Sequence, residues 1–182
     1  MFTDDEKRDL IKIARFAISE LLGLKHIEDY PDITKSLSAY NGVFVTLRNK
    51  SDLRGCIGLI ESEQPLYATV AEMAKSAASR DSRFPPVSME ELEYIDIEIS
   101  VLSLLKTIVD IRKIVVGDHG LLIRRMSYQG LLLPQVAIEN SWNRETFLIN
   151  TCRKAGLPDD AWKDDSTTIQ IFTAEVFCDF DI

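Results

Sequence analysis

The sequence predicts an α+β fold, in which a mainly antiparallel sheet is flanked by helices. Two kinds of apolar spacing lead to this fold class. Apolar residues recur at helical spacing between residues 10 and 22, and they alternate with polar residues in the strand-like segment 95–102. The other strand-like segments follow one another as hairpins without a strand–helix–strand repeat, so the sheet is expected to be antiparallel rather than parallel.

The first element is an amphipathic helix that begins after Thr3. Thr3 and Glu6 have the spacing of a capping box, in which the two side chains bind free backbone amides at a helix start. Gly23 is a natural stop for this helix. The apolar residues between these signals are Leu10, Ile13, Ala14, Ala17, Ile18, Leu21 and Leu22.

A β-hairpin is expected next. Residues 43–47 follow Asn41-Gly42 and have strand composition. Residues 48–52 form a polar five-residue turn, and residues 53–60 return as the second strand.

A second helix is predicted for the Ala-rich segment 66–79. It follows Pro65, a residue that is favoured at helix starts. The polar segment 80–86 ends in two prolines, which stop the helix. Ser88 and Glu91 then have the spacing of another short capped turn.

The second half of the chain begins with the cleanest strand, residues 95–102. Residues 117–120 form a turn. A second hairpin is expected from residues 121–126 and 131–133, with its turn at residues 127–130.

A third helix and a last strand complete the prediction. Ser141 can cap a helix that runs to Ala155, and Gly156-Leu157-Pro158 is a typical helix stop. Residues 169–177 have the composition of a final strand.

The net charge limits the classes of partner. The 182-residue chain is long enough for one domain with a sizeable core, or for one domain with two lobes. It carries 29 acidic against 21 basic residues, a formal charge of −8 at pH 7. Nucleic-acid binders usually show a basic face, and anionic membranes attract basic segments, so neither nucleic acid nor membrane is an expected partner.

The cysteine and histidine content limits the chemistry and the compartment. Three cysteines cannot all pair, no CxxC spacing occurs and only two histidines are present, so neither a disulfide framework nor a multi-zinc protein is expected. No metal or cofactor is predicted, because phosphate-binding glycine loops, GxSxG and HExxH are all absent from the sequence. The start of the chain is acidic and no apolar run reaches the ~18 residues of a membrane span, so the cytoplasm is the expected compartment.

The most unusual segment is residues 53–58, which read Leu-Arg-Gly-Cys-Ile-Gly. Glycine weakens a strand and marks a bulge or the close approach of another group. Strand alternation places Arg54, Cys56 and Gly58 on one face, where a guanidinium beside a thiol would activate it and Gly58 would leave a gap for a ligand. The opposing interpretation is that Cys56 packs as a small apolar residue, which is also expected for Cys152 and Cys178.

A histidine and a charged loop could add to this site, and each has a structural alternative. His119, in a turn before a strand, could act as the base for Cys56 or could only stabilise its turn. Asp81 and Arg83 lie in a loop stiffened by two prolines. They could face a ligand at the rim of a site, or they could only pair with each other.

Glu98 is the remaining candidate. It shares the polar face of its strand with Ser100. If that face opens on the same site, Glu98 is a partner for Arg54 or a general base. Otherwise this face is the solvated side of the sheet.

Several segments, taken in order, resemble the AMMECR domain family. The family hallmark, Leu-Arg-Gly-Cys-Ile-Gly, is intact at residues 53–58, and the one visible departure is Leu59, where the family has Thr. The further matching segments are 81–86, 99–102, 119–121 and 133–137, followed by Trp142, Leu157 and Trp162. The family includes a human protein from the Alport, midface-hypoplasia and elliptocytosis deletion region, and prokaryotic members labelled AmmeMemoRadiSam system protein A.

The resemblance implies an α+β fold with two lobes around a cleft, so that residues 1–182 form a single AMMECR-type domain. It also implies association with a Memo-like protein and a radical-SAM protein. It supplies no reaction, because the family has none assigned. The metal and iron–sulfur chemistry of such a system would belong to those partners.

The leading hypothesis is a component of this three-part system that binds or converts a small molecule. In an enzymatic version, Cys56 is the nucleophile, Arg54 activates it, and His119 or Glu98 moves protons. The candidates for contact with the ligand are Gly55, Gly58, Asp81 and Arg83. Two alternatives remain: a non-catalytic adaptor that binds other proteins, with a structural Cys56, and a nucleic-acid-associated regulator, against which the acidic charge counts.

Overall fold

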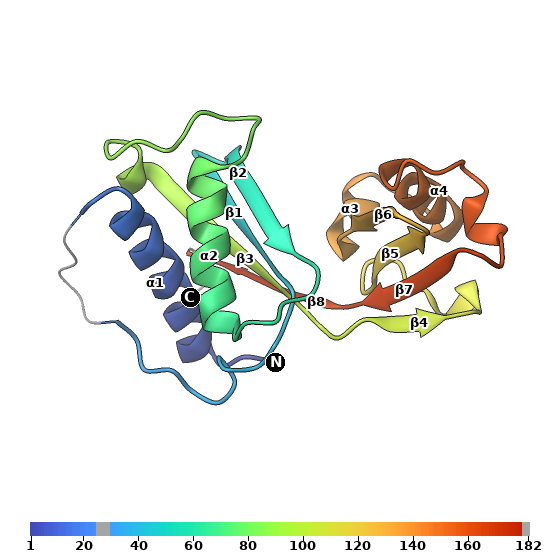
Figure 1. Cartoon of the computed structure of the whole chain (residues 1–182), viewed down its shortest axis with the longest axis horizontal. Coiled ribbons are helices and arrows are strands. Elements are labelled where there is room, and N and C mark those ends of the chain that lie inside the picture. The colour runs from blue at the N-terminus through green and yellow to red at the C-terminus, as the bar shows by residue number, and fades with distance from the viewer. Residues whose placement is uncertain (25–29, 180–182) are drawn as a thin grey trace. The chain divides into compact units, whose positions relative to one another are not determined.

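The chain divides into two compact units in the computed structural model, which describes residues 1–24 and 30–179. The first unit comprises residues 1–102 and 175–182, and the second unit comprises residues 103–174, which are inserted in the sequence of the first (Figure 1). Both units combine helices with antiparallel strand pairs, which confirms the α+β fold class. None of the helices in the described part of the chain is both long and apolar enough to cross a membrane.

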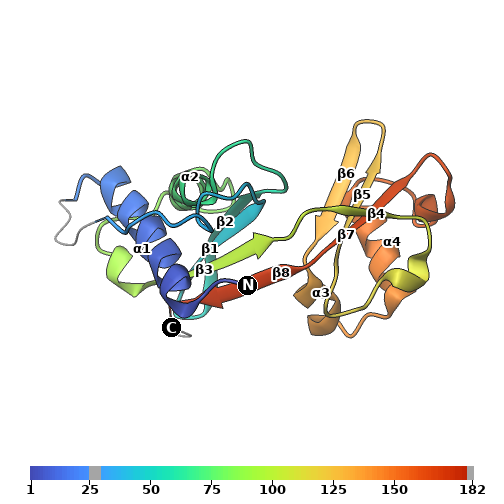
Figure 2. The ribbon, with the colours of Figure 1, turned by 90° about the horizontal axis from the view of Figure 1, so that it is seen from below.

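The first unit is a four-stranded sheet with two long helices packed on one face. Its helices are α1 (Asp4–Leu21) and α2 (Leu66–Ser79), and a short 3-10 helix, η1, spans Leu92–Tyr94. Its strands are β1 (Val43–Asn49), β2 (Asp52–Leu59), β3 (Ile95–Leu102) and β8 (Ala174–Cys178). The strand order is β2-β1-β3-β8, so β2 lies at an edge. The helices share the apolar core with the sheet and contact each other (Figure 2).

The strand register separates apolar from polar side chains. Val45 pairs with Ile99, and both are fully buried in the core that the helices cover. Thr46 pairs with Cys56 on β2 and with Glu98 on β3. Because directly paired residues of antiparallel strands share a face, these three side chains form one row on the face opposite the helices.

The first two helices form as predicted. The Glu6 N–H donates to Thr3 Oγ1 at 3.2 Å, and the Thr3 N–H donates to Glu6 Oε2 at 2.9 Å, so both bonds of the capping box are present. The second helix, α2, has the predicted bounds and buries its small apolar side chains against β1 and α1.

The second unit has its own sheet and its own core. Its strands are β4 (Lys106–Ile108), β5 (Gly120–Arg125), β6 (Tyr128–Leu132) and β7 (Thr168–Phe172), in the order β4-β7-β5-β6. Its helices are α3 (Pro134–Glu139) and α4 (Arg144–Lys154), with the short 3-10 helices η2 (Ile111–Lys113) and η3 (Ala161–Lys163). Phe147 and Leu148 of α4 are fully buried in this core.

The first hairpin turn is shorter than predicted. The pairing of β1 with β2 continues to Asn49 and Asp52, so the turn consists of Lys50 and Ser51 alone and not of five residues. Both turn residues adopt left-handed conformations, with φ of 51° and 74°. Two consecutive left-handed residues match the twist of a hairpin closed by a two-residue turn.

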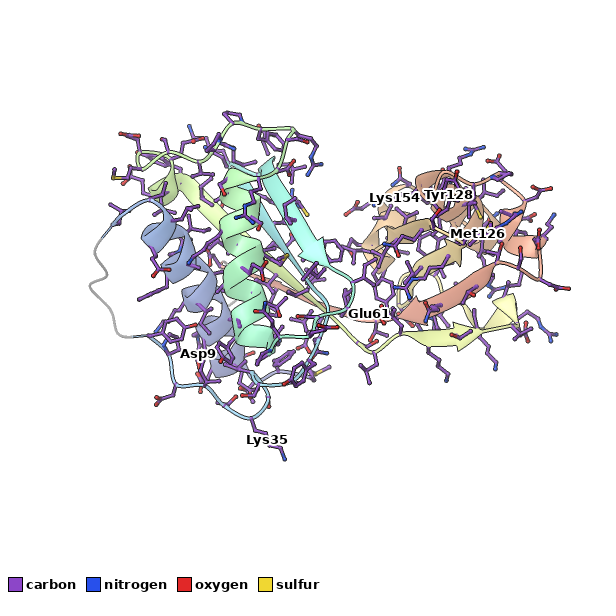
Figure 3. The ribbon with its side chains drawn as sticks, in the orientation of Figure 1. Asp9, Lys35, Glu61, Met126, Tyr128 and Lys154 are labelled. Atoms are coloured by element: carbon purple, nitrogen blue, oxygen red, sulfur yellow. The ribbon has the colours of Figure 1, made fainter. Side chains whose placement is uncertain are left out.

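The second hairpin turn lies earlier than predicted. Met126 and Ser127 join β5 to β6, whereas residues 127–130 were expected to form the turn. Met126 has a φ of 54° and is 95% exposed, and Tyr128 at the start of β6 is 53% exposed (Figure 3). Gly130 suggested a turn, but it pairs with Ile123 within the hairpin.

The structure differs from the prediction at three further places. Ser141 does not cap the third helix; α4 begins after Asn143, whose side chain accepts the Thr146 N–H at 2.9 Å. The three-residue β4 and the six-residue α3 were not predicted, since such short elements carry too few residues to show a period. The expected last strand breaks at Thr173 into β7 and β8, which belong to different sheets.

Gly55 allows α2 to lie close to β2. A Cβ atom at this position would lie 2.3 Å from the Ala77 carbonyl oxygen, which is far too close for any side chain. The first glycine of the hallmark therefore serves the packing of helix on strand. This placement differs from the predicted contact of Gly55 with a ligand.

Gly55→Ala is expected to lower the free energy of unfolding by about 1–3 kcal/mol, because backbone must move to relieve the overlap with Ala77. Urea denaturation measures the change. Leu59→Ala, on the same strand at a side chain that is 40% exposed, is the control and should cost less than about 1 kcal/mol. Equal effects of the two substitutions would show that the close approach at Gly55 is unimportant.

Candidate functional site

Cys56 lies in the middle of the edge strand β2, with a half-buried side chain. Its Sγ accepts a hydrogen bond from Thr46 Oγ1 at 3.3 Å. Its backbone N–H points away from β1 and donates to Asp81 Oδ2 at 2.9 Å. In an antiparallel pair, an outward amide marks the non-hydrogen-bonded type of pair, in which facing side chains come closest. The pairing of the two strands therefore holds the thiol against Thr46.

Asp81 is a buried acid that covers the outer edge of β2. It follows Arg80, the C-cap of α2, and its side chain is only 5% exposed. Besides the Cys56 N–H, its carboxylate accepts bonds from Arg83 Nη2 at 2.6 Å and Arg83 Nε at 2.9 Å. The hydrogen bonds from Arg83 and from the Cys56 amide hold the pKa of Asp81 well below its ordinary value, although burial acts in the opposite direction.

Arg54 pairs with Glu91, an acid that was not selected from the sequence. Arg54 Nε and Nη2 donate to the two carboxylate oxygens of Glu91 at 2.9 and 3.0 Å, and Nη2 also donates to the Pro86 carbonyl at 3.2 Å. The Arg54 bonds, with a further bond from the Ser88 N–H, lower the pKa of Glu91. The spacing of Ser88 and Glu91, which is that of a capped turn, could have identified Glu91 from the sequence, because a carboxylate in such a turn is fixed in place.

Phe84 links these two ion pairs. The guanidinium carbons of Arg83 and Arg54 lie 5.4 and 6.0 Å from the centre of its ring, within the range of cation–π attraction. We call Arg54, Asp81, Arg83, Phe84 and Glu91 the edge network. Its charges neutralise one another, and it fastens residues 81–91 to β2. Arg54 Nη1 is buried without a hydrogen-bond partner among the described residues.

The space beside Gly58 is filled by the protein itself. Phe44 pairs with Gly58 across β1 and β2. A Cβ atom on Gly58 would lie 2.4 Å from the Phe44 ring and 2.5 Å from the Val43 carbonyl oxygen. The predicted gap for a ligand above Gly58 is therefore occupied by Phe44.

Glu98 shares a face with Cys56, an arrangement that the sequence left open, but it does not pair with Arg54. Its carboxylate lies 3.5 Å from Arg48 Nε. Two strand spacings of ~4.8 Å separate Glu98 from Cys56, with Thr46 between them in the row. Glu98 is thus near the thiol without touching it.

His119 belongs to the second unit and has a local partner. Its Nδ1 accepts the Val115 N–H at 3.1 Å, which stabilises the turn before β5. The described part of the first unit contains no histidine. A proton-transfer role for His119 stays a prediction.

The site offers one group for chemistry, because its charges are already paired. No cluster of three His, Cys, Asp or Glu side chains that could hold a metal ion occurs in residues 1–24 and 30–179. Arg83 binds Asp81, Asp81 binds the backbone of Cys56, and Arg54 binds Glu91, so these side chains position β2 and its loop. What this arrangement presents is the Cys56 sulfur, next to the Thr46 hydroxyl.

Comparisons with known proteins agree along nearly the whole chain. The family model described as AMMECR1 matches residues 11–177. A protein of Methanothermobacter thermautotrophicus is 47% identical over 95% of this chain and 94% of its own length. A protein of Pyrococcus abyssi is 44% identical over 92% of this chain and 87% of its own. The crystal structure of an uncharacterized protein from Pyrococcus horikoshii has 41% identity and a TM-score of 0.87, covering 97% of this chain and 93% of that one.

Asp81→Asn should destabilise the fold in a pH-dependent way. The folded-state pKa of Asp81 lies below its unfolded value, so the ionised acid stabilises the fold above the unfolded pKa, and this stabilisation is lost as pH falls through the folded-state pKa. The substitution is expected to cost about 2 kcal/mol at pH 7, and the difference from the parent protein should shrink below about pH 4. Urea denaturation at a series of pH values measures both effects.

Asp159→Asn is the matched control. Asp159 forms a similar two-bond pair with Arg153, but both side chains are more than half exposed. Its loss should cost less than about 1 kcal/mol at any pH. A pH-independent cost for Asp81→Asn would contradict the role assigned to the ionised carboxylate.

Proposed function

This chain belongs to the AMMECR1 family, and we propose that it is the small-molecule-binding component of a system that also contains a Memo-like protein and a radical-SAM protein. The prokaryotic label of the family, AmmeMemoRadiSam system protein A, supports the proposal of these two partners. The geometry around Cys56 supports the proposal that a small molecule binds there. Cytoplasmic localisation is part of the proposal, and it is supported by the free thiols of Cys56 and Cys152.

The observation that carries the proposal is the way in which Cys56 is held. A free cysteine that served only packing would need no hydroxyl on its sulfur, and the bond of Asp81 to the backbone amide holds that sulfur in one position. Here Asp81 binds the Cys56 N–H and Thr46 donates to Sγ, while the side chain stays half-buried. Such fixed groups on a rigid strand are what a binding site requires.

The row of side chains on this face suits a small polar molecule. Cys56, Thr46 and Glu98 supply a sulfur, a hydroxyl and a carboxylate in adjacent strands, and Arg48 adds a cation beside Glu98. These residues are placed by strand pairing, so their spacing is set before a ligand arrives.

Binding is favoured over catalysis, because the described residues of the first unit place no carboxylate or imidazole in hydrogen-bond contact with the Cys56 sulfur. The hydroxyl of Thr46 is the partner of Sγ, and the nearest candidate base in the row, Glu98, is paired with Arg48. Nucleophilic catalysis by a thiol normally relies on a base within hydrogen-bond reach. A catalytic Cys56 would need Glu98 to leave Arg48 and to reach the sulfur.

Iodoacetamide is expected to label Cys56 in the folded protein, roughly tenfold or more faster than Cys152. Cys152 is fully buried, and burial raises the pKa of its thiol, so it should react only after unfolding in urea. Peptide mapping by mass spectrometry quantifies both sites. Cys56→Ser removes the early label and Cys178→Ser should leave it unchanged. If Cys56 stays inert until the protein unfolds, a ligand cannot reach its sulfur and the proposed site is excluded.

Co-purification tests the partners. Tagged parent protein and Cys56→Ser are each expressed with the Memo-like and radical-SAM proteins of the same organism. Both versions are expected to retain the partners, because the thiol is assigned to the small molecule. Loss of the partners with Cys56→Ser alone would favour the adaptor alternative, and capture of neither partner by the parent protein would contradict membership of the system.

A further inference from the structure

The second unit contains a pocket whose lining includes none of the candidate site residues discussed above. Its volume is about 570 Å³, within the range of small-molecule sites. It lies where β4 ends and β7 begins, two strands that pair at one edge of the sheet (Figure 1). The segment after β4 forms one side, and η3 with the loop leading to β7 forms the other.

The apolar part of the pocket is continuous with the core of the second unit. Ile108 and Ile169 pair across β4 and β7, are each 5% exposed and line the pocket. Trp162 of η3 also lines it and packs against the same core. The pocket therefore has a rigid apolar floor with one indole ring.

The polar part of the lining is predominantly acidic. It contains the carboxylates of Asp110, Asp164 and Asp165 and a single ammonium group, that of Lys163. Asp110 binds Arg112, which lowers the pKa of this acid. The Asp164 side chain accepts two bonds from Ser166 and lies 3.5 Å from Arg125.

Asp165 is the acid left open, since it has no hydrogen-bond or ion-pair partner among the described residues of the pocket. It is exposed at the pocket wall. An unpaired carboxylate repels an anionic ligand and offers a neutral ligand only a hydrogen bond, whereas a cation gains the attraction of opposite charges as well.

Two further features of the wall bear on the ligand. Lys163 Nζ lies 5.0 Å from the centre of the Trp162 ring, so the charge of this lysine is engaged by the indole and no ion pair with Asp165 is formed. Thr167 Oγ1 is buried in the wall without a hydrogen-bond partner. A buried hydroxyl oxygen of this kind is satisfied when a bound N–H group or water reaches it.

We infer that this pocket binds a small organic cation, an amidinium, guanidinium or ammonium group carried on a flat apolar body. The charged head pairs with Asp165, and the apolar body lies against Trp162 and the isoleucine floor. This function is independent of Cys56 and of the proposed protein partners, and it gives the second unit a ligand of its own.

Benzamidine and benzamide are a matched pair of probes, since they share a flat ring and differ mainly in charge. Titration is followed by the indole N–H resonances in ¹⁵N-edited NMR spectra of the full chain, which has only two tryptophans. Trp162→Phe assigns the peak. Benzamidine is expected to shift the Trp162 peak in a saturable way, and benzamide to bind at least about fivefold more weakly.

Asp165→Asn should weaken benzamidine binding about threefold without changing the fold, because the side chain is exposed. Asp118→Asn is the control: it removes the same charge from an exposed position of the second unit outside the pocket, and it should have no effect. Equal binding of the two probes, equal effects of the two substitutions, or no saturable shift of Trp162 would each overturn the inference.

Discussion

The hydrogen bond from the Cys56 amide to the Asp81 carboxylate is the contact on which the candidate site depends. It joins the end of α2 to the outer edge of β2. A buried carboxylate is costly unless its charge is balanced, and Arg83 balances it with two hydrogen bonds. The acid thus fixes three things together: the strand edge, the loop after the helix, and the orientation of the residue that carries the thiol.

This contact also solves a general problem of β-sheets. An edge strand exposes backbone groups that can pair with other chains, and proteins cover such edges in various ways. Here charged side chains take part in the cover, since Asp81 binds a strand amide and Arg54 holds Glu91 and Pro86 beside the strand. Most residues of the hallmark segment therefore stabilise the fold at this strand edge. The fold does not require the side chain of Cys56 to be partly exposed.

The sequence predicted what depends on local spacing. The capping box of α1, the bounds of α2 and the alternation of β3 all depend on neighbouring residues, whereas the shared face of Cys56 and Glu98 depends on how β2 and β3 pair with β1. The partner of Arg54 was not predictable in this way, because Glu91 and Glu98 are equally suitable acids until the fold of the loop is known. The turns were mistaken because Lys50 and Met126, unlike Gly or Asn, give no signal of a left-handed backbone.

The insertion of one unit within the sequence of the other has a consequence for synthesis on the ribosome. Residues 103–174 form an uninterrupted stretch, so the second unit leaves the ribosome complete. The first unit begins earlier but finishes later, because β8 supplies the fourth strand of its sheet and Asp179 supplies bonds to Arg15 and to the backbone of Ile97. The first unit, which carries the candidate thiol, therefore lacks β8 beside β3 until the whole second unit has been translated.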